Sequence, residues 1–386
     1  MIGIFDGIHR IFRLRRRGAI VENGVFRLHW QFTAGLLLFL AVIISARQYV
    51  GAPIECTTLT GVPPAVINAY CWIYPTFTLP DAHKKQIGVD VPAPGIDNSA
   101  NYDKKKFVSY YQWVYLTLII QAILFYLPHY CWKSWEGGLM GALTGGTVRS
   151  EEERHKKREI ITLWIDRNFG RRNLYTYKYL FCELLCFFNV FMQMFLMDSF
   201  LNYEFMKYGI RVLEVLTQED SRRGDPMIYV FPRVTKCVFH EFGYSGDVMH
   251  RDVLCVLPQN VFNEKLFILV WFWFVLLLSI FSGLIIYRIV ILLSPSMRKR
   301  LLMNRCHLGD PEDVCLIVKA TNIGDWFFLY MMGPNLDSML FAEVIGEMAV
   351  TPNVRSNRND ARIQFNITEK TALKATAPNN SMSPAL

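Results

Sequence analysis

Charge is scarce in this chain and absent from long stretches of it. Charged residues make up 19% of the 386 residues and hydrophobic residues 52%, and no charged side chain occurs from Leu266 to Tyr287. Soluble domains carry about 25% charged residues. An apolar helix of ~20 residues can cross a hydrocarbon core of ~30 Å. We therefore expect an integral membrane protein.

Catalytic signatures are also missing. The sequence holds no Gly-rich phosphate loop, no Gly-x-Ser-x-Gly elbow and no His-Glu-x-x-His pair. Cys237 and His240 with Cys255 resemble part of a zinc site, but a fourth ligand is not apparent and disulfides are more common in an oxidising compartment. Cys306, His307 and Cys315 are too few and too loosely spaced for a metal. The sequence therefore predicts no enzyme, no cofactor and no metal.

Four apolar segments predict four transmembrane helices at residues 28–47, 107–132, 179–201 and 266–293. Lys and Arg cluster before the first span, between the second and third, and after the fourth, whereas the segment between the third and fourth is acidic. The positive-inside rule places both termini and residues 133–178 in the cytoplasm, and loops 48–106 and 202–265 outside. Basic residues beside spans suit anionic lipid, not nucleic acid.

The nine cysteines agree with this topology, because each outer loop receives two of them. Loop one carries Cys56 and Cys71, and loop two carries Cys237 and Cys255. Four cysteines in an oxidising compartment can pair completely, in three possible connectivities. The other five fall in membrane or cytoplasm and are expected to stay reduced.

The amino-terminal segment, residues 1–27, begins with an amphipathic pattern. Its apolar side chains gather on one helical face, with Asp6, Arg10 and Arg13 opposite. Such a helix can lie on the inner membrane surface or fold back into a pore mouth, and the residues alone favour the membrane surface.

The remaining segments have weaker patterns. Seven prolines in loop one predict irregular structure with at most short strands, and residues 227–237 could form a strand. Residues 151–169 and 310–350 have helical composition, with Asp310 as N-cap and Pro311 at the first helical position, within a cytoplasmic helical region 294–350. The tail 351–386 is expected to be disordered.

Few polar groups occur inside the predicted spans, which disfavours a transporter. Glu183 and Asp198 lie near the ends of the third span, where each could snorkel or cap a neighbour. Gln112 and Gln121 in the second span are expected to make interhelical hydrogen bonds. Pro128 should bend this span and free a carbonyl.

One pentapeptide carries a resemblance to a known family. Tyr110, Tyr111, Gln112, Trp113 and Val114 form the string that is the signature of the innexins, the invertebrate gap-junction proteins. Further stretches agree with arthropod innexins, and the resemblance covers about residues 1–349: Arg47–Cys56, Tyr70–Trp72, Trp132–Gly138, Asp225–Cys237, Asn263–Lys265 and Gly324–Tyr330.

The resemblance implies an all-α four-helix membrane bundle with disulfide-stapled outer loops containing short β-strands, in a ring-forming large-pore channel subunit. The expected location is the plasma membrane at gap junctions. Innexin rings, reported as octamers, act alone as hemichannels or dock with a ring on the next cell, and other innexins are further partners. The family's amino-terminal helix lines the pore as a funnel, which would place Asp6, Arg10 and Arg13 on the pore. Family loop architecture also implies Cys56 paired with Cys255 and Cys71 with Cys237.

A different class of protein shares several of these features. A non-conducting four-span adhesion protein would also carry stapled outer loops, and its outer loops would also lack glycosylation sequons, as here. The amphipathic amino terminus favours the channel, because an adhesion protein has no use for it.

Overall fold

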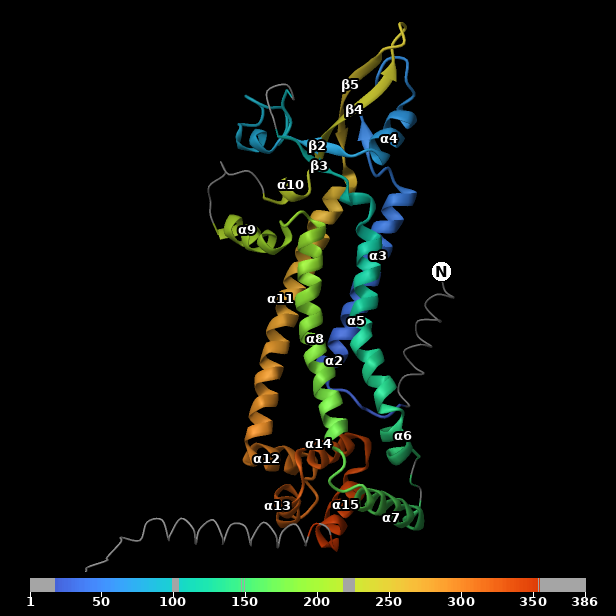
Figure 1. Ribbon diagram of the computed structural model, residues 1–386, viewed down its shortest axis with the longest axis vertical. Coiled ribbons are helices and arrows are strands. Elements are labelled where there is room, and N and C mark those ends of the chain that lie inside the picture. Colours follow the sequence, from blue (N-terminus) through green and yellow to red (C-terminus); the bar gives the residue numbers. More distant parts are fainter. Residues whose placement is uncertain are drawn as a thin grey trace, which may run out of the picture. The chain divides into compact units, whose positions relative to one another are not determined.

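The computed structural model describes residues 18–98, 104–146, 148, 150–217, 226–352 and 354. These residues form helices and one five-stranded sheet (Figure 1). The chain divides into two compact units. The outer-loop unit combines Gly24–His129 with Leu184–Gly283, and the cytoplasmic-helix unit combines Tyr130–Glu183 with the segments before Gly24 and after Gly283.

Within the part of the chain that the structure describes, four helical segments are long and apolar enough to cross a membrane, as the sequence predicts. The first, Gly24–Val50, consists of α2 (Gly24–Arg27), the π-helical turn η2 (Leu28–Phe32) and α3 (Thr33–Val50). The others are α5 (Val114–Glu136), α8 (Asn173–Phe200) and α11 (Pro258–Leu293). At 1.5 Å per residue the shortest, α5, reaches about 35 Å and exceeds the hydrocarbon core.

The helix bounds differ from the predicted spans, most clearly at residues 107–113. This stretch, assigned to the second span, instead forms the end of β3 (Lys106–Val108) and the 3-10 turn η5 (Tyr110–Gln112). The backbone of β3 pairs with β2 (Thr76–Thr78), which holds it in the outer loops. Apolar composition did not separate this strand from the helix, because both bury hydrophobic side chains.

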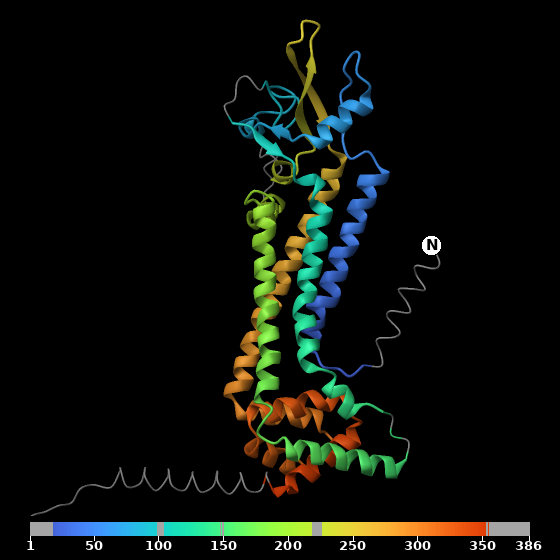
Figure 2. The ribbon, with the colours of Figure 1, turned by 45° about the vertical axis from the view of Figure 1, so that its right-hand side comes forward.

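The sheet draws its strands from both outer loops, in the order β1-β5-β4-β2-β3 with antiparallel neighbours. Loop two supplies a hairpin of β4 (Val234–Phe242) and β5 (Val248–Val256), which extends away from the long helix α3 of the same unit (Figure 2). Loop one supplies β2 and β3 at one side and β1 (Glu55–Cys56) at the other. The predicted strand at 227–237 is therefore displaced, since residues before Pro232 form α10 (Pro226–Val230).

Loop one is less irregular than its prolines suggest. It contains α4 (Pro64–Ile73) and the 3-10 turn η3 (Pro80–Lys84), each with proline at its start. A proline at the first helical position loses no hydrogen bond and has a suitable φ. The proline count was therefore a poor guide, because two of these residues begin helices.

Loop two also contains a helix that the sequence reading missed, α9 (Phe205–Thr217). Asp198 at the outer end of α8 caps it, because its Oδ1 accepts a hydrogen bond from the Met206 backbone N–H at 2.8 Å. Trp271 of α11 lies so close to Gly209 that a Cβ there would fall 2.2 Å from the indole. Asp198 thus has the interfacial capping role that its position suggested.

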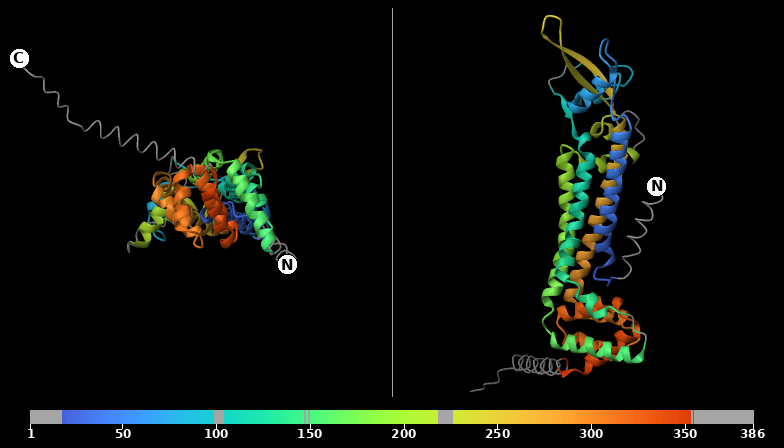
Figure 3. Two further views of the ribbon diagram at one scale, coloured as in Figure 1. Left: turned by 90° about the horizontal axis from the view of Figure 1, so that it is seen from below. Right: turned by 90° about the vertical axis from the view of Figure 1, so that its right-hand side faces the viewer.

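Among its described residues, the cytoplasmic-helix unit contains six further helices and one short turn. They are α6 (Leu139–Thr144), α7 (Glu151–Arg167), α12 (Pro295–Arg305), α13 (Pro311–Ala320), α14 (Ile323–Met332), η6 (Gly333–Asn335) and α15 (Ser338–Val350). The helices after α11 group together, as the orange-to-red ribbons show (Figure 3). Asp310 caps α13 and Pro311 begins it, as predicted. Arg158 of α7 contacts Glu343 of α15 at 3.4 Å, which joins the middle segment to the last helix.

Candidate functional site

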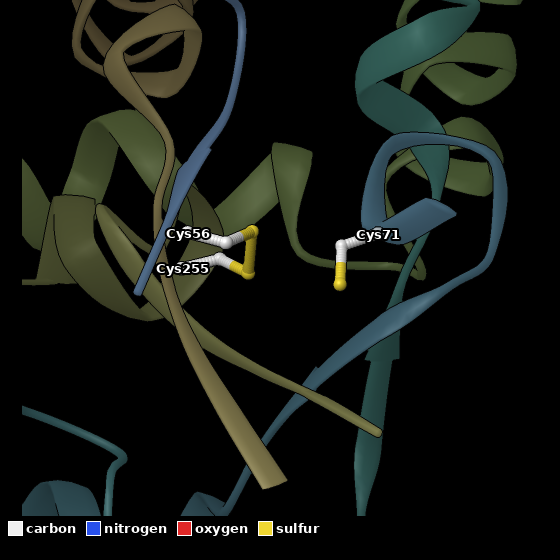
Figure 4. A group of neighbouring side chains, drawn as sticks. All are labelled: Cys56, Cys71 and Cys255. Carbon is white, nitrogen blue, oxygen red and sulfur yellow. A yellow bond between two sulfur atoms is a disulfide. The ribbon is translucent and has the colours of Figure 1, made fainter. Parts of the chain in front are cut away.

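Two disulfides staple the outer loops to each other. Cys56 pairs with Cys255, and Cys71 pairs with Cys237, which is the pairing that the resemblance implied. Cys56 and Cys255 face each other in the register of β1 and β5 (Figure 4). Each bond closes a long stretch of chain, 199 and 166 residues. The two loops therefore form one cross-linked body.

A hydrophobic cluster surrounds these sulfurs. Cys71, Cys237 and Cys255 are buried there with Ile67 of α4, Phe239 of β4 and neighbouring side chains from both loops. Burial of apolar surface in this cluster adds to the covalent links, at about 25 cal/mol per Å². Loop one and loop two thus share a single small core.

The two tyrosines of the signature pentapeptide connect this core to α5. The Tyr110 hydroxyl donates to the Val230 carbonyl at 2.9 Å, and the Tyr111 hydroxyl donates to the Cys71 carbonyl at 3.4 Å. Burial raises the pKa of Tyr111 to about 12 and also raises the pKa of Tyr110, so both hydroxyls stay protonated donors. Tyr110 thereby holds loop two, and Tyr111 holds loop one.

The rest of the pentapeptide continues this connection. Gln112 donates its side-chain N–H to the Trp72 carbonyl in loop one, so the interhelical bond predicted for it is wrong. Val114 is fully buried at the start of α5, whereas Trp113 is 58% exposed. Because α5 begins only at Val114, Gln112 lies too early to face another span. The described contacts give the signature a structural role at the loop–helix joint.

The turn of the β4–β5 hairpin exposes large apolar side chains. Phe242 is 79% exposed, Tyr244 is fully exposed, and Val248 is 52% exposed. The turn closes with the Gly243 N–H donating to the Asp247 carbonyl at 2.8 Å, and Gly246 adopts a positive φ of 86°. We call Phe242, Tyr244 and Val248 the hairpin tip. Exposed apolar groups gathered at one protruding turn are typical of a contact surface.

Pro128 lies inside α5, where it cannot donate a backbone hydrogen bond to the carbonyl of Leu124. Asn189 of α8 donates to that carbonyl instead, at 3.2 Å, and its amide also contacts His29 Nε2 at 3.3 Å. His29 lies in the π-helical turn η2 and is fully buried. The carbonyl expected to be freed by Pro128 thus has a partner from α8, while a bend at Pro128 stays a prediction.

The interhelical hydrogen bond predicted for Gln121 is present but long. Its side-chain amide donates to the Gln193 carbonyl of α8 at 3.5 Å.

A buried ion pair joins α8 to α11 in the cytoplasmic-helix unit. Arg288 donates two hydrogen bonds to the Glu183 carboxylate, at 2.7 and 2.6 Å, and both side chains are at most 10% exposed. Asn23 donates to the same carboxylate at 2.6 Å, which ties the segment before α2 to the pair. Glu183 does not snorkel, because a bidentate guanidinium satisfies it locally. The sequence reading missed this pair, because its two residues lie 105 positions apart in the chain.

A second buried pair supports the start of α8. Arg172 Nε lies 3.7 Å from Asp325 Oδ1, and both residues are at most 5% exposed. Burial lowers the pKa of Arg172 to about 10 and raises that of Asp325, while the Gly170 N–H donates to Asp325 and opposes its shift. At neutral pH the guanidinium keeps its charge, so this pair fixes the α7–α8 turn on α14.

The predicted pore-lining residues are not among those that the structure describes. Asp6, Arg10 and Arg13 fall outside the described residues, as does the tail apart from residues 351, 352 and 354. Within the described ranges, one group of three close metal-ligand side chains occurs, Cys56, Cys71 and Cys255, and all three sulfurs are in disulfides.

Comparison with known proteins shows extensive similarity to one family. A family model described as Innexin matches residues 22–351. Innexin inx1 of Schistocerca americana is 44% identical over 350 residues, covering 90% of this chain and 97% of that protein. Innexin shaking-B of Drosophila melanogaster is 42% identical over 353 residues, covering 90% and 94%. Innexin inx2 of the same fly is 40% identical over 354 residues, covering 90% and 95%.

Proposed function

The chain belongs to the innexin family of gap-junction channel subunits, and from that premise we propose that it assembles as an octameric ring which docks with a ring on the neighbouring cell. Alone, the ring acts as a hemichannel. Docked, it passes ions and small molecules between two cytoplasms, and other innexins can share the ring or the opposing one. The adhesion alternative is not favoured, because innexins are channel proteins.

The docking proposal rests on the cross-linked outer loops. Docking needs a surface that keeps its shape while it faces water, and the two disulfides with their shared core supply such rigidity. The hairpin tip presents exposed apolar groups at the end of this body. In an octamer the tip is repeated eightfold, so modest contacts per subunit add up to a stable junction.

Tyr244→Asp at the tip is expected to reduce electrical coupling between paired expressing cells at least tenfold, because it places charges where apolar groups would meet. Hemichannel currents in single cells should stay within about twofold, since Tyr244 is fully exposed and lies in the turn between β4 and β5, outside the spans. A tenfold loss of a junction's affinity needs only about 1.4 kcal/mol. The matched control is Lys84→Asp, an exposed position on η3 outside the tip.

Two results would count against docking through the tip. Unchanged coupling in Tyr244→Asp at normal surface expression would remove the tip from the junction. Equal loss of hemichannel currents would show that the variant damages the subunit itself. Dye transfer in the same cell pairs separates conduction from adhesion.

We also propose that the amino-terminal helix lines the pore, with Asp6, Arg10 and Arg13 toward water. The apolar face of Ile4, Phe5, Ile8, Ile11 and Phe12 would then pack on the wall. Charges repeated around a ring in a low-dielectric wall focus their field on passing ions.

Asp6→Lys is therefore expected to shift hemichannel selectivity toward anions, measured as a reversal-potential change under a salt gradient. The shift should grow at low ionic strength, where the screening length is longer. Asp103→Lys, in outer loop one, serves as a charge-matched control that should shift selectivity less. An unchanged reversal potential, together with a cysteine at position 6 that never reacts with thiol reagents in open channels, would place this helix on the membrane instead.

A further inference from the structure

Two histidines occupy facing positions on the β4–β5 hairpin. His240 and His250 are Cα partners in the antiparallel register. The Gly243 N–H donates to the Asp247 carbonyl at one end, and the Leu257 N–H donates to the Arg233 carbonyl at the other. Hydrogen-bonded and non-hydrogen-bonded pairs alternate along an antiparallel ladder, so the pair 240–250 falls on a non-hydrogen-bonded position. Side chains approach most closely at such positions, where facing Cα atoms lie about 4.5 Å apart.

The imidazoles of this pair are close together and accessible. Their ring centres lie 4.8 Å apart with the planes nearly perpendicular, at 86°, and both residues are exposed. A zinc ion binds a histidine nitrogen at about 2.0–2.1 Å, so one ion between the rings can reach a nitrogen of each. Because the rings meet edge to face, side-chain rotation is needed to point a nitrogen lone pair of each ring at the same ion.

Tyr70 of α4 holds one of the two rings. Its hydroxyl lies 2.8 Å from His240 Nδ1. When Nδ1 carries the proton and donates to this oxygen, the lone pair is on Nε2, which is then free to bind a metal. Metal-ligating histidines usually have such a partner on their other nitrogen, because it sets the tautomer and the ring orientation.

The charged groups nearby do not oppose a cation at this position. Glu241 and Arg251 alternate to the opposite face of the hairpin and pair with each other there. On the same face, Asp252 pairs with Lys236 at 2.6 Å, one ladder step beyond the histidines. The positively charged side chains of β4 and β5 are therefore paired with carboxylates away from the two rings.

We propose that His240 and His250 form a binding site for a borderline divalent transition metal such as Zn²⁺, with two histidine ligands and water in the remaining positions. Imidazole nitrogen suits zinc, copper and nickel, whereas calcium and magnesium prefer oxygen. A bound ion bridges β4 to β5 and fixes the hairpin below its tip. This inference does not depend on docking, since a single undocked subunit contains both ligands.

Zinc titration of the purified full-length protein, with free thiols blocked, tests the site. We expect isothermal titration to show a binding component in the wild type that His240→Gln and His250→Gln both lose. Tyr70→Phe keeps both ligands and is expected to bind 10–100-fold more weakly, the usual effect of removing an orienting partner. His155→Gln, on the exposed surface of α7, is the matched control and should titrate like the wild type.

Hydrogen exchange is a second measurement, because zinc bound nonspecifically elsewhere would not slow amide exchange in the hairpin. Zn²⁺ should slow amide exchange across residues 234–256 in the wild type and in His155→Gln, but not in His250→Gln. Intact disulfides, checked by peptide mapping, show that each variant is folded. Identical isotherms for the wild type and His250→Gln, or no protection of the hairpin when zinc is bound, would overturn the proposal.

Discussion

Cys56→Ser is expected to abolish junctional coupling between paired cells. The substitution opens a link between segments 199 residues apart and leaves Cys255 with a free thiol in the shared core of the outer loops. Loss of a native disulfide typically costs about 2–5 kcal/mol. The loops of a 386-residue membrane protein have only a small core of their own to offset this loss. The measurement is electrical coupling at matched surface expression.

The pairing itself is tested by combining substitutions. Cys56→Ser with Cys255→Ser should be no worse than Cys56→Ser alone, because both remove the same bond. Cys56→Ser with Cys71→Ser removes both disulfides and should be more destabilising. Cys315→Ser, at a free cysteine, is the control and should couple normally. Peptide mapping that joins Cys56 to Cys71 would contradict the links between loops.

Glu183→Gln is expected to destabilise the protein by about 3–5 kcal/mol, because it leaves the Arg288 guanidinium buried without its counter-charge. Arg288→Gln should have a comparable effect for the same reason. The readout is the thermal unfolding of detergent-purified protein, with surface expression in cells as a second measurement. The hydrogen bond from the Asn23 amide should weaken as well, because its acceptor is no longer a charged carboxylate.

The exposed pair of Glu152 and Lys156 on α7 provides the matched control. Its atoms lie 2.8 Å apart, but both side chains are more than two-thirds exposed, and such surface pairs contribute about 0–1 kcal/mol. Glu152→Gln should therefore change the melting temperature little. Combining Glu183→Gln with Arg288→Met should recover much of the lost stability, because no unpaired charge remains. Equal effects of Glu152→Gln and Glu183→Gln would refute the special role of the buried pair.

Local features of the chain were predictable because they depend on neighbouring residues. Asp310 and Pro311 mark the start of α13 through their own hydrogen-bonding and φ preferences. Asp198, at the end of a span, caps the next helix. The strand β3 and the helix α4 were missed, because their residues resemble a span or a proline-rich loop until their partners are known. The helix α9 was missed although its buried side chains, Phe205, Tyr208 and Val212, recur at helical spacing.

The sequence by itself determined that the chain is a four-span membrane protein with two cysteines in each outer loop, because apolar length and charge asymmetry act locally along the chain. Only the tertiary structure decided which distant groups meet. Three pairings were equally open to four cysteines, and the register of β1 on β5 selects one. The same holds for Glu183 with Arg288 and for His240 with His250. A contact between distant residues depends on how whole elements align, and one step of strand register or a quarter-turn of a helix would separate each of these pairs.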